Sequence, residues 1–354
     1  MSAPLLWVGE HPNYITEEHE KVMDSVINYY KTDVTDVNIP YEYKKMFLDN
    51  GAYTALFNGI ELDVERVLGV QETINPDLTI PLDYPYRPGM ERKEMERRQE
   101  KTKENILYWN ENSSLKIVPP LHAIGTKSLI DHIKWLQKNC NSDFLAVGSV
   151  ITRYNSAINI TKKFNGFFGD RQPSKQLIDT LLFVGQLMQM HSDFDFHMMG
   201  LGTSPLTYHL TVYCGVHSTD CSGHRRKAAF GKIILPGTGE KYICDRGAKF
   251  GVTEMSDADM EKLSQCQCPI CRELPADAVL RKEKLASHWK LRAIHNKWVM
   301  EQEEKRAEML LDDGIDVYEK FLEELFIGSS LKYLFEYAKQ MRNQSRVEMW
   351  LGGW

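Results

Sequence analysis

The feature that most constrains the fold is an alternation of short apolar runs with longer amphipathic stretches. The apolar runs have the length of buried strands and lie at Leu5–Val8, Lys45–Leu48, Leu78–Leu82, Leu115–Val118, Phe144–Val147, Phe196–Met199 and Val216–Thr219. Helical periodicity fills intervals at Asp63–Thr73, Ser128–Lys138 and Gln176–Met190. Strands that alternate with helices form a parallel sheet, and seven or eight such units over about 220 residues predict an α/β fold of the (β/α)8 TIM-barrel type.

A cluster of cysteines near the C-terminal end predicts a metal site. Cys266, Cys268 and Cys271 are followed by two histidines, His288 and His295. Cysteines at this spacing rarely arise for packing, and three thiolates with one imidazole supply the four ligands of a structural zinc ion. The spacing alone leaves the fourth ligand open between the two histidines. Such a closed Zn2+ site would hold a subdomain together and take no part in bond breaking.

Segments that lie outside the alternation of strands and helices predict further elements beside the barrel. Glu17–Tyr30 predicts a helix, and Glu91–Tyr108 predicts a highly charged helix beside the barrel. Phe230–Ile243 predicts a hairpin that turns at Pro236–Gly239, and the tail predicts two helices around Gly328. We therefore expect a barrel domain over 1–260 that includes the hairpin 230–243, an appended zinc-binding subdomain over 261–298, and C-terminal helices over 299–354 packed on the barrel.

Composition and charge exclude several classes of protein. The net charge of −6 argues against a purely electrostatic nucleic-acid binder, so phosphate contacts would need local basic stretches such as His224–Lys227 or Arg281–Arg292. For the second stretch a solvated face is the favoured interpretation. The scattered cysteines form no disulfide framework, the N-terminus lacks a signal-peptide pattern, and no apolar run approaches the ~18 residues of a membrane span. We therefore expect a cytoplasmic protein, in the host cytoplasm if it is viral, with no membrane contact.

Polar residues and glycines directly follow most of the predicted strands. They are Asp49, Asp83, His122, Gly148 with Ser149, Gly200 with Gly202, and Asp220. The carboxyl ends of barrel strands meet at one rim, where barrel enzymes build their active sites. Taken singly, each carboxylate is more often a cap or turn residue, and the histidine is more often structural. Their joint placement favours a shared site, because clustered carboxylates can divide the roles of acid, base and nucleophile.

Two kinds of residue in this set suit particular tasks. Asp220 ends a strand beside small residues, which suits a carboxylate nucleophile. Gly148-Ser149 and Gly200-Leu201-Gly202 carry little side chain, so their backbone groups could approach the edge of a flat ligand. Tight turns explain each glycine pair equally well.

Six motifs, in this order, resemble the tRNA-guanine transglycosylase family over most of the chain. They are Leu48–Tyr53, Ile80–Asp83, Val147–Val150, His197–Gly202, Ser218–Cys221 and the cysteine cluster with His295-Asn296. The resemblance implies a pentosyltransferase in which Asp220 attacks C1′ of a guanosine nucleotide, forming a covalent glycosyl-enzyme, while Asp49 is the general acid and base. It implies substrate binding by Asp83, Gly148, Ser149, Gly200 and His122, and a structural Zn2+ held by Cys266, Cys268, Cys271 and His295.

Departures from the family pattern affect the expected substrate. Ala52 and Tyr53 replace a glycine and a phenylalanine of the family's Asp-Ser-Gly-Gly-Phe motif, and Pro119–Ala123 stands in place of its Gln-Gly-Gly segment. The altered pocket resembles the branch of the family that places 7-deazaguanines in DNA. We therefore expect exchange of guanine in DNA for a free, preQ0-like 7-deazaguanine base. The alternatives are the same reaction on tRNA and a noncatalytic nucleic-acid-binding subunit, and the resemblance is compatible with a homodimer.

Overall fold

The computed structural model describes residues 5–11, 18–86, 90–122, 126–148, 194–243, 255–329 and 331–343. The chain divides into two compact units, one of Met1–Val8 with Gly200–Trp354 and one of Gly9–Met199. The predicted helix Gln176–Met190 and the candidate residue Ser149 lie outside the described residues. The boundaries expected at residues 260 and 298 stay a prediction. No helix in the described ranges is long and apolar enough to cross a bilayer.

Eight parallel strands form the main sheet. Their bounds are β1 Leu5–Gly9, β2 His19–Ser25, β3 Tyr43–Asp49, β4 Leu78–Thr79, β5 Pro120–Leu121, β6 Phe144–Val147, β7 Asp195–Met198 and β8 Ser218–Cys221. The strand order β4-β3-β2-β1-β8-β7-β6-β5 is the sequential order of a barrel. The predicted fold class, α/β of the TIM-barrel type, is confirmed.

In the unit Gly9–Met199, six of these strands follow one another in sequence order. β2 pairs with β3 with Val22 opposite Met46, and β6 pairs with β7. A parallel bridge between Thr79 of β4 and Ile117, just before β5, joins the two sets of three strands. Consecutive residues of β6, Leu145–Val147, are buried, because a barrel strand is covered on both faces.

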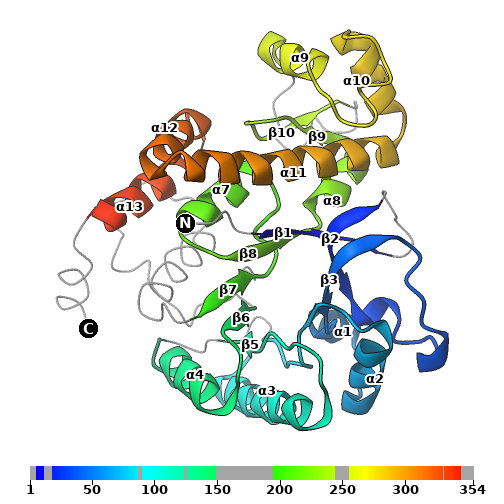
Figure 1. Ribbon diagram of the computed structural model, residues 1–354, viewed down its shortest axis with the longest axis vertical. Helices are drawn as coiled ribbons and strands as arrows, with labels where there is room; N and C mark the ends of the chain where they lie inside the picture. The colour runs from blue at the N-terminus through cyan, green and yellow to red at the C-terminus, as the bar shows by residue number, and fades with distance from the viewer. Residues whose placement is uncertain are drawn as a thin grey trace. The chain divides into compact units, whose positions relative to one another are not determined.

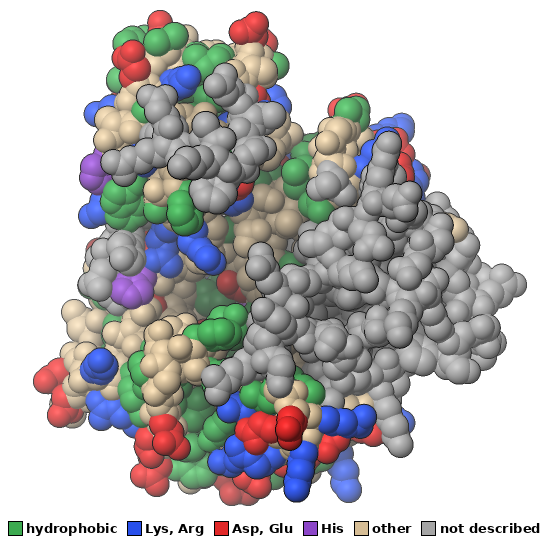
Figure 2. Space-filling view, turned by 180° about the vertical axis from the view of Figure 1, so that it is seen from behind, with side chains coloured by type: hydrophobic (Ala, Val, Ile, Leu, Met, Phe, Trp, Pro, Cys, Tyr) green, Lys and Arg blue, Asp and Glu red, His purple; other side chains and the backbone are tan. Residues whose placement is uncertain are grey.

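The helices of this unit confirm three predictions from the sequence. Their bounds are α1 Ala52–Asn58, α2 Val64–Ile74, α3 Arg92–Asn112 and α4 Thr126–Asn139. Asp63 caps α2 by accepting a hydrogen bond from Arg66 N at 2.8 Å. α3 and α4 lie side by side (Figure 1), and ion pairs such as Arg92 with Glu96 run along the exposed surface of α3. Acidic and basic side chains are intermixed along the lower edge of the face in Figure 2.

The other unit joins β1 and β8 to a set of helices and a hairpin. Its elements are α7 Pro205–Tyr213, α8 Gly223–Ala229, β9 Lys232–Ile234, β10 Glu240–Tyr242, α9 Asp257–Ser264, α10 Ala278–Ser287, α11 Trp289–Asp312, α12 Ile315–Leu325 and α13 Lys332–Asn343. α11 runs beside α7 and α8 (Figure 1), and Glu304 on α11 accepts a hydrogen bond from Leu6 N of β1 at 2.8 Å. The predicted hairpin is confirmed, with β9 and β10 antiparallel.

Three predicted elements differ from the structure. Glu17–Tyr30, expected to be a helix, contains strand β2 and the 3-10 turn Val26–Asn28. Charged residues at the start of β2 imitate an amphipathic helix, whereas Val22 and Met23 are buried in the parallel pairing with β3. The run Leu115–Val118 contributes only a bridge among the described residues, and the strand follows at β5. The tail forms α12 and α13 around Gly328, but a third helix, α11, begins inside the expected zinc-binding subdomain.

Candidate active site and metal centre

Asp83 lies on an irregular segment after β4, and its carboxylate is held at both oxygens. Asn50 Nδ2 donates to Oδ1 at 2.9 Å, and His122 Nε2 lies 2.5 Å from Oδ2. The Asp83 side chain is 12% exposed, so it is shielded but still reachable. Each carboxylate oxygen has a further lone pair, so Asp83 can accept two more hydrogen bonds from the N–H groups of a flat ligand.

His122 directly follows β5, and its side chain is buried against Asp83. The ring of Tyr86 packs 5.3 Å from it, between centroids. A Cβ atom on Gly148, after β6, would lie 3.2 Å from His122 Cε1, which is tighter than ordinary contact. Gly148 therefore leaves room for the histidine, a reason for glycine that the sequence did not reveal. Its own N–H is directed to Leu121 O at 3.4 Å.

Asp49 is the last residue of β3, at the carboxyl end expected for a rim residue. Its Oδ2 accepts hydrogen bonds from Ser25 Oγ at 2.9 Å and from Gly51 N at 3.0 Å. Gly51 has φ +80°, and a Cβ there would lie 2.7 Å from Ile27 Cβ, so the turn requires glycine. On α1, which begins immediately after this turn, Tyr53 is 47% exposed.

Asp220 belongs to β8 in the other unit and is bound by the glycine turn that follows β7. Gly200 N donates to Asp220 Oδ1, and Gly202 N donates to the Asp220 carbonyl oxygen at 3.0 Å. A Cβ on Gly202 would lie 2.6 Å from Leu6 Cδ1 and 2.9 Å from Asp220 O. The glycine pair therefore wraps the strand end that carries the predicted nucleophile, and the N–H of Gly200 stabilises negative charge on its carboxylate.

The structure thus brings Asp83, His122 and Gly148 into one cluster, and Asp220 and Gly200 into another. Sequence reasoning missed Asn50 and Ser25, which orient two of the carboxylates. A signal for Asn50 was present, since an amide beside Asp49 in a strand-end turn can reach a neighbouring strand end. No such signal existed for Ser25, because its strand was interpreted as a helix.

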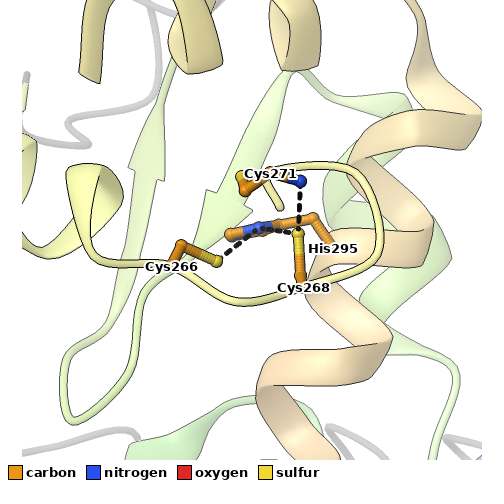
Figure 3. Close-up of side chains that lie close together, drawn as sticks. All are labelled: Cys266, Cys268, Cys271 and His295. Atoms are coloured by element: carbon orange, nitrogen blue, oxygen red, sulfur yellow. Dashed lines mark hydrogen bonds between the residues drawn. The ribbon is translucent and has the colours of Figure 1, made fainter. Parts of the chain in front are cut away.

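Cys266, Cys268, Cys271 and His295 are buried with their ligand atoms within 4.8 Å of one another (Figure 3). His295 Nδ1 is 3.3 Å from Cys268 Sγ and 3.6 Å from Cys266 Sγ. Its Nε2 lies 2.8 Å from the carbonyl oxygen of Ile234, which fixes the proton on Nε2 and leaves Nδ1 for a metal. Three thiols and one imidazole at these separations fit a tetrahedral metal ion. His288 is exposed and instead caps α11, accepting from Lys290 N at 3.2 Å.

The surroundings of the cluster favour metal binding. Hydrogen bonds from the Cys268 and Cys271 thiols lower the pKa of Cys266 far below its ordinary value, which favours the thiolate, the form that binds metals. The cysteines share an apolar core with Ile233 and Leu235 of the hairpin. The hairpin assigned to the barrel domain therefore packs against the metal cluster.

The basic stretch Arg281–Arg292 is not simply a solvated face. Arg281 is buried, and its Nη1 donates to the carbonyl oxygens of Leu263 and Cys266 at 3.0 Å each. Arg292 is also buried, with Nε donating to Ala228 O at 2.8 Å. The expectation of a solvated face is wrong for these two arginines, because Arg281 donates to backbone carbonyl oxygens beside the cysteines and Arg292 donates to carbonyl oxygens of α8 and α10.

A barrel of eight parallel strands, some of which end in carboxylates, and a buried cluster of three cysteines and a histidine that could hold a metal ion together define a class of α/β-barrel protein. The family model described as queuine tRNA-ribosyltransferase matches residues 52–326. This match covers well over half of the chain, which therefore belongs to the queuine tRNA-ribosyltransferase family. The family predicted by resemblance is confirmed.

Curated relatives in archaea carry the name tRNA-guanine(15) transglycosylase. The chain is 23% identical over 273 residues to the protein of Pyrococcus furiosus, a match that covers 75% of this chain and 40% of the relative. It is 21% identical over 269 residues to the protein of Thermococcus onnurineus and 21% identical over 271 residues to that of Thermococcus kodakarensis, with the same shares covered. The chain therefore spans about two fifths of the length of the curated relatives it matches.

Proposed function

We propose that this chain is a guanine transglycosylase that exchanges guanine in tRNA for a free 7-deazaguanine base. The observation that carries the proposal is the carboxylate of Asp83, oriented by Asn50 and His122 and partly exposed. A carboxylate fixed in this way matches the ring N–H and exocyclic amine on one edge of guanine. The names of the archaeal relatives favour tRNA, the alternative of the sequence analysis, over DNA.

In this proposal Asp220 is the nucleophile. It attacks C1′ of the target guanosine, the bond between C1′ and the base breaks, and Asp49 as the general acid protonates the leaving guanine while a covalent glycosyl-enzyme forms. Asp49 then takes a ring proton from the incoming base, which attacks C1′ and releases Asp220. Two inversions give net retention, as in retaining glycosidases. The hydrogen bonds that Asp220 and Asp49 accept from Gly200 N and Gly51 N support both roles, because they fix the orientation of the two carboxyl groups.

The metal in this proposal is Zn2+ bound by Cys266, Cys268, Cys271 and His295. The donor set and its burial support zinc, and a site closed by four protein ligands is structural rather than catalytic. Base recognition by Gly148, Ser149 and Gly200, location in the cytoplasm and a homodimer remain parts of the proposal.

The test is incorporation of radiolabelled guanine into two polymers, unmodified tRNA and double-stranded DNA, in separate reactions. We expect label to enter tRNA. Label in DNA alone would overturn the assignment to tRNA and support the DNA-modifying alternative. Label in neither polymer, with zinc bound, would overturn the proposed activity.

The nucleophile is tested with a matched pair of variants. Asp220→Asn should abolish incorporation and the covalent complex that denaturing gels detect, because an amide cannot attack C1′. Asp131→Asn, a change of the same kind at an exposed position of α4, should retain both. Full incorporation by Asp220→Asn would contradict the assigned role.

A further inference from the structure

One face of α3 carries three buried polar side chains at intervals of three residues, Gln99, Thr102 and Asn105, referred to here as the α3 polar row. Residues three apart on a helix lie above one another on the same face. The same face is apolar one turn further on, where Ile106 and Trp109 are fully buried. Apolar packing was therefore available to this helix, and the polar row needs another explanation, because buried polar groups destabilise a fold unless they are paired.

Each member of the row binds backbone next to the candidate base-binding residues. Asn105 Nδ2 donates to Leu82 O at 2.8 Å, and Thr102 Oγ1 accepts from Tyr84 N at 3.0 Å. These two contacts flank Asp83 on either side. Gln99 Nε2 donates to the carbonyl oxygen of His122 at 3.1 Å. One helix face thus fixes the main chain on both sides of a carboxylate and at the histidine paired with it.

Two further side chains complete this arrangement. Gln71 Nε2 donates to Ile80 O at 2.8 Å, and Asn50 Nδ2 donates to Pro81 O at 2.7 Å. The segment that carries Asp83 lies beyond β4; Ile80 N still donates to Leu48 O of β3 at 3.1 Å, but the carbonyl oxygens of Ile80, Pro81 and Leu82 need partners other than strands. Side chains supply those partners instead, which satisfies the buried backbone and removes freedom from the segment.

We propose that the α3 polar row positions the Asp83–His122 pair for base recognition, so that its three members are positioning residues of the exchange reaction. The inference rests on the proposed function. A bound base would contact Asp83, and its affinity depends on how well the carboxylate is fixed before binding, since supporting hydrogen bonds set the geometry of a site. The row does not touch the sugar carbon. Its loss should therefore weaken binding of the free base more than it slows the chemical step.

Thr102 offers the sharpest test, because its hydroxyl makes two bonds. It donates to Arg98 O at 2.9 Å within α3 and accepts from Tyr84 N. Thr211 on α7 is also buried, and its hydroxyl makes a bond of the first kind, to Thr207 O at 2.7 Å. Thr102→Val and Thr211→Val each remove one hydroxyl bond within a helix, but Thr102→Val alone leaves the Tyr84 amide without its acceptor. Thr102→Ser restores the acceptor.

We expect Thr102→Val to raise KM for free guanine about tenfold with kcat nearly unchanged, because the Tyr84 amide without its acceptor lets the Asp83 segment depart from the geometry that binds the base. Hydrogen exchange of the Tyr84 amide should become faster in the same variant. Thr102→Ser should return both to the wild-type values, and Thr211→Val should alter neither. Equal effects of the two valine substitutions, or a loss of kcat with KM unchanged, would overturn the positioning role.

Failure of the inference can be told apart from failure of the proposed function. A wild-type protein that binds zinc but incorporates no base into either polymer contradicts the function. Calorimetric titration with guanine then tests the row separately. A weaker association for Thr102→Val than for Thr211→Val supports positioning, and equal association overturns it.

Discussion

At the scale of single residues, the carboxylates at strand ends differ in how completely they are satisfied. Asp24 near the end of β2 is buried and accepts hydrogen bonds from Tyr29 OH at 2.6 Å, from Tyr41 OH and from Asn28 Nδ2. Burial, and then the charge of Asp24, raises the pKa of Tyr29 and of Tyr41 well above their ordinary values, so both hydroxyls stay protonated donors. Asp83 keeps acceptor capacity and some exposure. We infer that Asp24 is structural, although it also lies at a strand end.

His132 on α4, whose Nδ1 lies 3.2 Å from Gln99 Nε2 of the α3 polar row, predicts a dependence of the free energy of unfolding on pH. Burial lowers the pKa of His132 to about 3, and electrostatic interactions with His122 and Lys103 lower it further. As pH falls below about 6.5, the unfolded chain binds a proton at this position and the folded chain does not. The free energy of unfolding should therefore fall by about 1.4 kcal/mol per pH unit from this residue, down to the folded pKa.

His132→Phe removes the contribution of this imidazole to the pH dependence of the free energy of unfolding. Unfolding in urea at pH 7, 6, 5 and 4 should give a shallower loss of stability for the variant than for the wild type, whatever the difference between them at pH 7. Parallel curves for the two proteins would show that the imidazole titrates alike in the folded and unfolded chains.

At the scale of elements, α11 connects the metal cluster to the rest of its unit. It supplies His295 to the cluster, and its Glu303 binds His209 of α7 at 2.8 Å. Glu303 also accepts from Gly237 N at 2.8 Å in the hairpin turn. α11 therefore connects the cluster of Cys266, Cys268, Cys271 and His295 to α7 and to the hairpin, so loss of structure at the cluster should also affect these two elements.

Removal of the metal should consequently destabilise α7 and the hairpin as well as the loop that carries the cysteines. We expect the purified chain to contain one zinc ion, and Cys268→Ser to lose it, because serine cannot replace a thiolate ligand. The variant should unfold at a lower temperature and expose the hairpin and α9 to protease. Cys140→Ser, at a half-buried cysteine outside the cluster, is the matched control and should keep the metal. Equal metal content in the two variants would contradict the ligand assignment.

At the scale of the whole molecule, the sequence predicted what depends on local pattern. β6 was predicted at its observed bounds, and the three cysteines of the cluster were predicted from their spacing, whereas the choice of His295 over His288 came from the family resemblance. β2 was missed, because the charged residues Glu20 and Lys21 near its start, followed by Val22 and Met23, resemble the pattern of an amphipathic helix. The link between His122 and Asp83 was also missed, since it joins positions that only tertiary structure brings together. Sequence pattern therefore located the carboxylates but not the side chains that orient them.

A chain with net charge −6 that binds a polyanion needs a local basic surface, and α8 of the stretch His224–Lys227 offers one. Lys227 pairs with Glu240 and His224 is buried, whereas Arg226 is exposed and makes no ion pair among the described residues.

Arg226→Glu should weaken binding of tRNA about fivefold or more at low salt, and it should reduce the slope of log Kd against log salt concentration by about one. Lys305→Glu, an equal charge reversal at an exposed position of α11, is the control. Filter binding measures the Kd of both variants for tRNA between about 50 and 200 mM salt, the range over which binding through phosphate contacts weakens strongly. Equal weakening in both variants would assign the effect to net charge, whereas weakening confined to Arg226→Glu would show that α8 binds a phosphate of the tRNA backbone.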